Sequence, residues 1–211
     1  MILGYDYAAQ PLSVRALVWL TAGYSGFFVM SIEMLAGRLL APTFGADIFV
    51  WGAVIAVFMI GLSLGYGVGG AWSAHQPSPA RLGALAVATG CASLITALAA
   101  PGVSDFFGAA ISDIRVGAFC AAFVLFAAPA FCAGATTPYS VRLIVRDVTS
   151  AGRSAGLLSF VSTAGSAAGV ILTSFVLILY FEVTHILIAM ALGGILVGSA
   201  LIARSMLVKP A

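Results

Sequence analysis

The stretch GYSGFFVMSIEMLAGRLLAPTFG, residues 23–45, decides how this chain folds and where its chemistry lies. It is apolar enough to cross a membrane, yet it carries Glu33 and Arg38. A charged side chain at the centre of a membrane helix costs about 2.5–3.5 kcal/mol on insertion scales. An ionisable group in such a place is a candidate functional residue by default, and its partner has to be sought elsewhere in the chain.

The composition places the chain among integral membrane proteins. Of its 211 residues, 62% are hydrophobic and 8% are charged, and the mean hydropathy is +1.15. Soluble domains carry about 25% charged residues. The apolar residues come in long blocks, as in membrane helices, and not in the alternating pattern of a β-barrel. The sequence therefore predicts an all-α integral membrane protein.

Turn signals divide the apolar blocks into six predicted transmembrane helices. They cover residues 14–40, 48–72, 82–100, 116–144, 154–180 and 183–203. We expect three parts along the chain: an N-terminal cytoplasmic lead (1–13), a six-helix transmembrane domain (14–204) and a cytoplasmic tail (205–211).

Prolines mark the predicted helix ends and kinks. Pro42 and Gly45 are expected to end the first helix, and Pro101-Gly102 to begin a loop after the third. Pro129 and Pro138 predict a kink or a break in the fourth helix, because proline removes a backbone hydrogen bond and clashes with the preceding turn.

Positive charge is divided unevenly between the two sides of the predicted bundle. One side holds both termini and seven of the nine Lys and Arg residues: Arg15, Arg81, Arg142, Arg146, Arg153, Arg204 and Lys209. The other side holds Arg38 and Arg115. Such an excess marks the cytoplasmic side of a membrane protein. We therefore expect a multi-pass protein of the plasma (inner) membrane with both termini in the cytoplasm.

Glycine recurs at spacings that favour close helix contact. Gly61, Gly65 and Gly69 lie four residues apart on the second predicted helix and form a smooth stripe. A shift of 104 residues also aligns five pairs of identical residues. They are Arg38 with Arg142, Leu39 with Leu143, Gly52 with Gly156, Gly61 with Gly165, and Gly65 with Gly169. One interpretation is a 3+3 inverted repeat, as in many transporter folds. The other is chance recurrence in a glycine-rich chain.

Glu33 is the first candidate site residue. It shares one helix face with the small or flexible residues Gly26, Met30 and Gly37, so it points towards a neighbouring helix. It is either a binding site for a cation or proton, or a structural carboxyl that is paired or kept neutral by burial. Arg115 is a possible partner.

Arg38 lies five residues further on, at a different angle around the helix, so it does not pair with Glu33 within the helix. Asp47 is its expected partner, and the alternative is a side chain that extends to the membrane surface.

The fourth predicted helix carries the other polar candidates. Thr137 and Tyr139 flank Pro138, which frees a backbone carbonyl that can face a cavity. The alternative is an ordinary proline kink satisfied by threonine hydroxyls. Arg142 is either a solute ligand or a determinant of topology and lipid contact. Tyr66, on the second helix, is expected to line a cavity, where its ring can contact a cation.

Several segments resemble the membrane domain fused to spermidine-synthase-like proteins, whose helices are related to half of a major facilitator transporter. The matching segments are SIEMLAGRLLAPTFG (31–45), WG (51–52), GLSLGY (61–66), GG (69–70), GATTPYSVRL (134–143), GRSAG (152–156) and STAGS (162–166). They lie in order within about residues 20–180. The resemblance implies a half-major-facilitator-like bundle and an association with polyamines or related amines.

The chain departs from the family pattern in two places. The second helix of the family ends in a Gly-Gly-Arg-Leu-Ala-Asp type sequence, where this chain has GGAWSA (69–74). No aminopropyltransferase domain or glycine-rich nucleotide loop is recognised in the 211 residues, so we expect a stand-alone membrane domain. Synthase activity is not carried over.

Two functions remain open from the sequence. The first is a transport-type protein that moves or binds a small cationic solute, either as a monomeric bundle or as a homodimer with twelve helices. The second is a non-transporting membrane subunit that anchors or serves a separate soluble synthase-like enzyme. We expect no catalytic residues, because no Ser/His pair or metal-binding set stands at helical spacing. The chain is expected to interact with the lipid bilayer, and no cofactor, metal or nucleic acid is expected.

Overall fold

The computed structural model describes residues 10–75, 77–145 and 148–207, without the side chains of residues 148–150. Within these ranges six helices are long and apolar enough to cross a membrane, which makes the chain a multi-pass membrane protein. The long helices are α1 (Leu12–Phe44), α2 (Ile48–Ser73), α3 (Pro79–Ala110), α4 (Ile114–Ile144), α5 (Val148–Leu172) and α7 (Val183–Leu207). A π-helical segment, η1 (Thr173–Leu177), and the short α6 (Ile178–Tyr180) continue α5.

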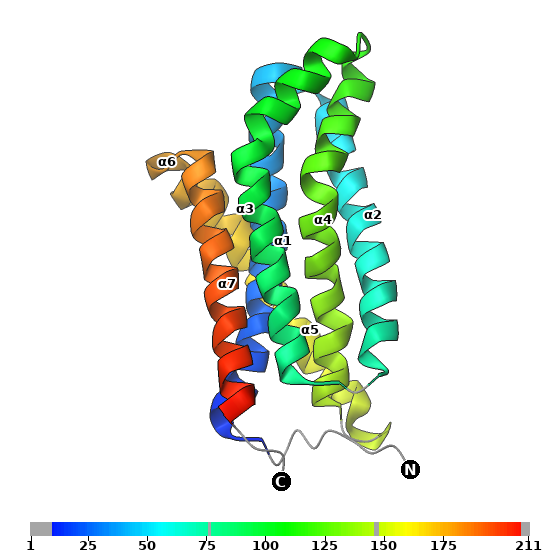
Figure 1. Ribbon diagram of the computed structural model, residues 1–211, viewed down its shortest axis with the longest axis vertical. Helices are drawn as coiled ribbons and strands as arrows, with labels where there is room; N and C mark the ends of the chain where they lie inside the picture. The colour runs from blue at the N-terminus through cyan, green and yellow to red at the C-terminus, as the bar shows by residue number, and fades with distance from the viewer. Residues whose placement is uncertain (1–9, 76, 146–147, 208–211) are drawn as a thin grey trace.

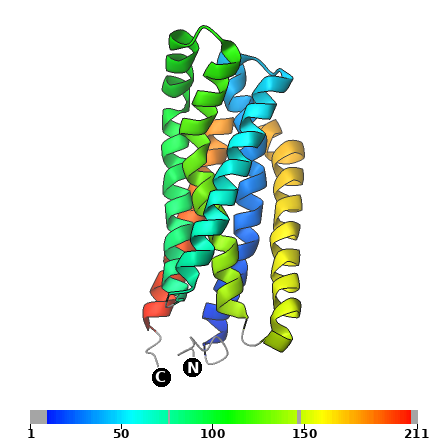
Figure 2. The same ribbon diagram turned by 90° about the vertical axis from the view of Figure 1, so that its right-hand side faces the viewer.

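The helices lie side by side in one elongated bundle with α1 among the others (Figure 1). α1 contacts α3, α4, α5 and α7, while α2 packs mainly on α4 and α3 packs on both α4 and α7. α5 lies at the edge of the bundle and packs mainly on α1 (Figure 2). The start of α1 and the end of α7 lie at the same end of the bundle, as an even number of spans requires (Figure 1).

The first helix is longer than predicted. α1 has 33 residues and is about 50 Å long, so it exceeds the ~30 Å hydrocarbon core. It continues through Pro42 to Phe44. Gly45 then ends it with a φ of 81°, a left-handed conformation that glycine adopts without strain, and donates its N–H to the carbonyl of Ala41.

The predicted loop at Pro101-Gly102 is wrong. α3 continues through Pro101 to Ala110. Beyond the proline, Val103 and Phe107 pack against the core. These contacts offset the hydrogen bond that proline removes. α4 likewise continues through Pro129 and Pro138 without a break.

The fifth long helix begins earlier than predicted. α5 begins at Val148, six residues before the predicted start, and its helical path becomes π-helical at Thr173. Arg146, counted among the cytoplasmic positive charges, lies outside the described residues.

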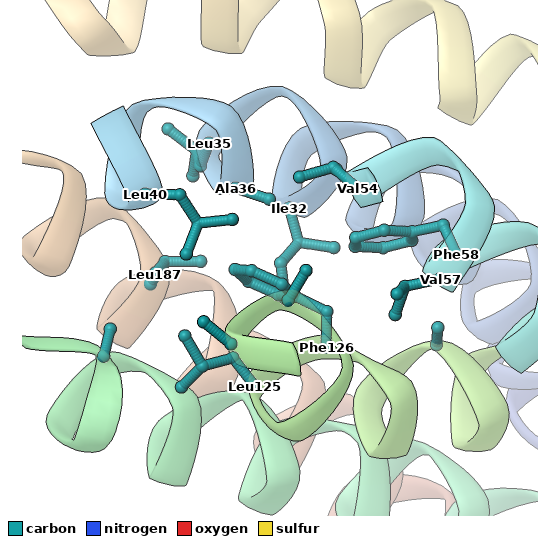
Figure 3. Packing of buried hydrophobic residues seen from close by; sticks show 14 of the residues in the cluster. Ile32, Leu35, Ala36, Leu40, Val54, Val57, Phe58, Leu125, Phe126 and Leu187 are labelled. Atoms are coloured by element: carbon teal, nitrogen blue, oxygen red, sulfur yellow. The ribbon is translucent and has the colours of Figure 1, made fainter. Parts of the chain in front are cut away.

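Aromatic and branched side chains from four helices fill the larger core cluster. Ile32 of α1, Phe58 of α2 and Phe126 of α4 meet there, and Leu187 of α7 joins them (Figure 3). The rings of Phe58 and Phe126 lie 5.7 Å apart. This packing places the half of α1 that bears Glu33 against the middle of the bundle.

The glycine stripe of α2 lies directly on α4, as its spacing predicts. A Cβ added at Gly61 would lie 2.8 Å from the Cβ of Ala130, and one added at Gly69 would lie 2.6 Å from the Cα and O of Ala135. Close backbone approach of this kind is the main source of helix association in lipid, because lipid chains are as apolar as the side chains.

Candidate functional site

Glu33 lies on a face of α1 that contacts α5 before this residue and α2 after it. Seven residues earlier on the same face, a Cβ at Gly26 would meet the backbone of Ser162 in α5. Four residues later, a Cβ at Gly37 would lie 2.8 Å from the ring of Trp51 in α2. The Glu33 side chain itself is partly buried. The carboxylate therefore lies between the α5 contact and the α2 contact, in the membrane-spanning part of the bundle.

Glu33 has no partner within the described part of the chain. No hydrogen bond or ion pair is formed there by its carboxylate. Another carboxylate, that of Glu182, has His185 Nδ1 at 3.5 Å from its Oε2. The suggested pairing with Arg115 is not formed. The backbone N–H of Arg115 instead donates to Asp113 Oδ1 at 2.9 Å, in the cap of α4.

The predicted pairing of Arg38 with Asp47 is also wrong. Both residues are exposed near the end of the bundle opposite the start of α1, and no ion pair joins them. Exposed charges gain little from pairing, because water or headgroups solvate each of them and the side chains lose entropy when they are held together. Arg38 is exposed on the surface of α1.

A pair of hydroxyls joins α1 and α4 at the centre of the bundle. Ser25 Oγ and Thr136 Oγ1 are 2.7 Å apart, and both also reach the carbonyl of Ala133, at 3.2 and 2.6 Å. Ser140 donates to the carbonyl of Thr136 at 2.7 Å. These bonds place hydroxyl donors on the carbonyls of Ala133 and Thr136, in the turn before Pro138.

The central polar region is almost filled. A void of about 10 Å³ lies beside the hydroxyl pair, lined by Thr21, Tyr24, Ser25, Phe28, Ala86, Thr89 and Thr136. A single water requires about this much space. Glu33 lines neither this void nor either of two larger apolar cavities, one between α1 and α7 and one between α3 and α4.

The remaining predicted site residues differ in burial and in the residues that they contact. Tyr139 is fully buried, accepts a hydrogen bond from the Ser78 N–H at 3.2 Å and packs its ring on Trp72 at 5.7 Å. Tyr66 is 46% exposed on α2. Thr137 is partly buried, and Arg142 is exposed in the last turn of α4.

Over the residues that the structure describes, no hydrogen bond, ion pair or ring contact joins any two of the six predicted site residues, Glu33, Arg38, Tyr66, Thr137, Tyr139 and Arg142. Tyr139 holds the α2–α3 turn against α4.

Sequence reasoning missed the Ser25–Thr136 pair and the hydrogen bond from Tyr24 Oη to the carbonyl of Met190. A signal for the first was present, since Ser25 lies seven residues before the core residue Ile32 and so on the same face of α1. Nothing in the local sequence marks Met190 as the acceptor for Tyr24.

No family model, curated protein or solved structure matches the chain. The resemblance to the spermidine-synthase-like membrane domain therefore stays a prediction that rests on the quoted motifs.

Proposed function

We propose that the chain is a transport-type membrane protein of the plasma (inner) membrane, with both termini in the cytoplasm, that binds a small cationic solute at Glu33. By the family resemblance, the solute is polyamine-like. The observation that carries the proposal is the carboxylate of Glu33, which lies within a membrane-spanning helix and has no partner among the described residues.

The position of Glu33 sets it apart from the other described carboxylates. Asp47, Asp113 and Glu182 lie at the ends of helices, and Asp105 lies near the end of α3, where Thr43 Oγ1 reaches its carboxylate at 3.4 Å. Glu33 alone among them lies 11 residues, about 17 Å, from the end of its helix. A carboxylate at that depth favours a cation from outside the fold, because the fold itself supplies none.

Helix contacts support the 3+3 inverted repeat and the half-major-facilitator-like interpretation. A Cβ at four glycines would meet a backbone carbonyl of the facing helix: Gly61 meets Ala127, Gly165 meets Gly23, Gly65 meets Phe131, and Gly169 meets Phe27. Gly165 lies 104 residues after Gly61, and Ala127 lies 104 residues after Gly23. The contacts of Gly65 and Gly169 are related by the same offset. The α2–α4 contact therefore corresponds to the α5–α1 contact, with α1 and α4 running in opposite directions.

The same offset relates Glu33 of α1 to Thr137 of α4. The first lies in the outer part of the bundle and the second in the inner part, next to Pro138. In a transporter built on such a repeat, α1 and α4 exchange roles as the two halves rock. We propose that a second copy completes this unit, as a twelve-helix homodimer, because Glu33 faces a side of α1 that α2 and α5 leave partly uncovered.

The test is solute-dependent thermal stabilisation of the purified protein, across a panel of polyamines, monoamines, amino acids and nucleosides. A ligand at 100 times its dissociation constant adds about 2.7 kcal/mol to the stability of the folded state. For a chain of this size we expect the midpoint of unfolding to rise by about 5–10 °C. Glu33→Gln should abolish this rise.

Asp47→Asn is the matched control, because it removes an exposed carboxylate at the outer end that makes no side-chain cap hydrogen bond. We expect it to keep the full stabilisation by the amine. Equal stabilisation of wild type and Glu33→Gln by the same amine would reject Glu33 as the site.

The nearly filled centre favours the second function, a membrane subunit that serves a soluble synthase-like partner. Such a subunit requires only a dry core and an inner binding surface, and Arg142, Arg153 and Arg204 are exposed at the inner end. If no compound stabilises the wild type, and Glu33→Gln is as stable or more stable, this second function is favoured.

A further inference from the structure

An apolar groove opens on the side of the bundle between α1, η1 and α7, far from the face that bears Glu33. Its volume is about 290 Å³. Phe27 of α1, Leu177 of η1, and Ile186, Ala189 and Met190 of α7 are among its lining residues. We call it the α1–α7 groove. It lies within three segments that are long and apolar enough to span the membrane, so lipid chains surround its opening.

The two ends of the groove differ in chemistry. At the inner end, Tyr24 closes it by donating its hydroxyl to the carbonyl of Met190, and Gly193 leaves room for the phenol, since a Cβ there would lie 2.7 Å from Tyr24 Oη. At the outer end, His185 lines the mouth and lies 3.5 Å from the carboxylate of Glu182. The wall between these ends is apolar.

The length of the groove fits one hydrocarbon chain from one leaflet. Residues 185–193 of α7 follow its wall, and eight residues of helix rise by about 12 Å. One leaflet contributes about 15 Å of the hydrocarbon core. A chain that enters beside His185 therefore ends near Tyr24.

We propose that the α1–α7 groove binds one acyl chain of a phospholipid with an ethanolamine headgroup. The headgroup then lies at the mouth, where its ammonium donates to the Glu182 carboxylate and its phosphate faces the His185 ring. Phosphatidylcholine has no N–H to donate to Glu182, and phosphatidylglycerol places an uncompensated negative charge beside it. This inference does not depend on Glu33 or on transport.

The experiment is native mass spectrometry of the delipidated full chain, titrated with phosphatidylethanolamine, phosphatidylcholine or phosphatidylglycerol that carry the same acyl chains. We expect one molecule of phosphatidylethanolamine to bind most tightly. Ala189→Phe fills the groove from an exposed position on α7. Excluding about two methylene groups predicts about tenfold weaker binding of all three lipids.

Ala200→Phe is the matched control. Ala200 is exposed on the same side of α7, 11 residues beyond Ala189, and does not line the groove. We expect it to bind lipid as the wild type does. The unfolding midpoints of Ala189→Phe and Ala200→Phe are compared in lipid-free detergent. If Ala189→Phe unfolds at the lower temperature, Ala189→Leu, which adds a smaller side chain to the groove, takes its place.

Glu182→Gln tests the headgroup assignment separately. We expect it to keep the bound chain and to lose the preference for phosphatidylethanolamine. Unchanged lipid binding by both Ala189 variants would overturn the groove as the lipid site. A shift of these variants from dimer to monomer, with lipid binding unchanged, would also overturn it, because a second copy of the chain would then occupy the groove. An unchanged headgroup preference in Glu182→Gln would overturn the ethanolamine assignment.

Discussion

Two glycines that stand two residues apart on α2 should respond in opposite ways to the same substitution. Gly69 is buried against α4, and an added Cβ would lie 2.6 Å from the Cα and O of Ala135 and 2.8 Å from its Cβ. Gly67 is exposed, and an added Cβ would meet nothing within 4 Å. Neither glycine has a positive φ, so alanine fits the backbone conformation at both positions.

The magnitudes follow from this geometry. At Gly69, α4 has to retreat by about 0.8 Å to restore an ordinary contact of 3.4 Å, and the nearest atoms are backbone and Cβ atoms that no rotamer change can move. Overpacking of this kind costs about 1–3 kcal/mol. Replacing glycine in a helix by alanine contributes about 0.5–1 kcal/mol in return. We expect Gly67→Ala to be stabilised by that gain, and Gly69→Ala to be about 1–2 kcal/mol less stable than wild type.

Thermal unfolding of both variants in one detergent measures the difference. A change of 1 kcal/mol shifts the midpoint by about 2–4 °C for a chain of 150–250 residues. Gly69→Ala should therefore unfold several degrees below Gly67→Ala. If Gly69→Ala is as stable as Gly67→Ala, the close approach of α2 and α4 is wrong, and with it the account of the glycine stripe.

Two further predictions concern the centre and the orientation of the bundle. Ser25→Ala and Thr136→Val should each destabilise the protein modestly. A double-mutant cycle should give a coupling energy of about 0.6 kcal/mol, which is the average for hydrogen bonds between membrane helices. A coupling energy of zero would mean that the two hydroxyls do not interact. In a variant without the three native cysteines, Asp47→Cys should react with a membrane-impermeant thiol reagent in intact cells, whereas Ala74→Cys should react only after lysis; the reverse pattern would place both termini outside.

The sequence was sufficient to predict the six helices and the α2 stripe, for a physical reason. In lipid every backbone polar group has to be satisfied within the segment, so long apolar blocks leave little choice but helix. Small residues at spacing four mark the surface where another backbone approaches, and Gly61 and Gly69 do lie on α4.

The continuation of α3 through Pro101 was not predictable from the local sequence. A proline-glycine pair ordinarily ends a helix, whereas α3 continues because Val103 and Phe107 pack against core residues far away in the chain. The same limit applies to η1, because TSFVL has no feature that distinguishes a π-helical turn from an α-helical one.

The candidate site was also predictable from the sequence only in part. The unusual position of Glu33 was visible in the sequence, because one carboxylate in an apolar block needs no partner to be recognised. The pairings of Glu33 with Arg115 and of Arg38 with Asp47 depended on the lateral positions of helix ends, and neither ion pair is formed. Tyr139 was assigned to solute binding from its motif, and its contacts with Ser78 and Trp72, which hold a turn in place, could not be read from that motif.

The missing partner of Glu33 constrains the function more than a paired carboxylate would. Removing one partner from a buried ion pair leaves an uncompensated charge, so the phenotype of a paired Glu33 would mainly report the loss of stability. Without a partner among the described residues, Glu33→Gln relieves a cost instead of creating one. Loss of amine-dependent stabilisation in a Glu33→Gln protein that is itself no less stable than wild type would therefore come from the site and not from damage to the fold.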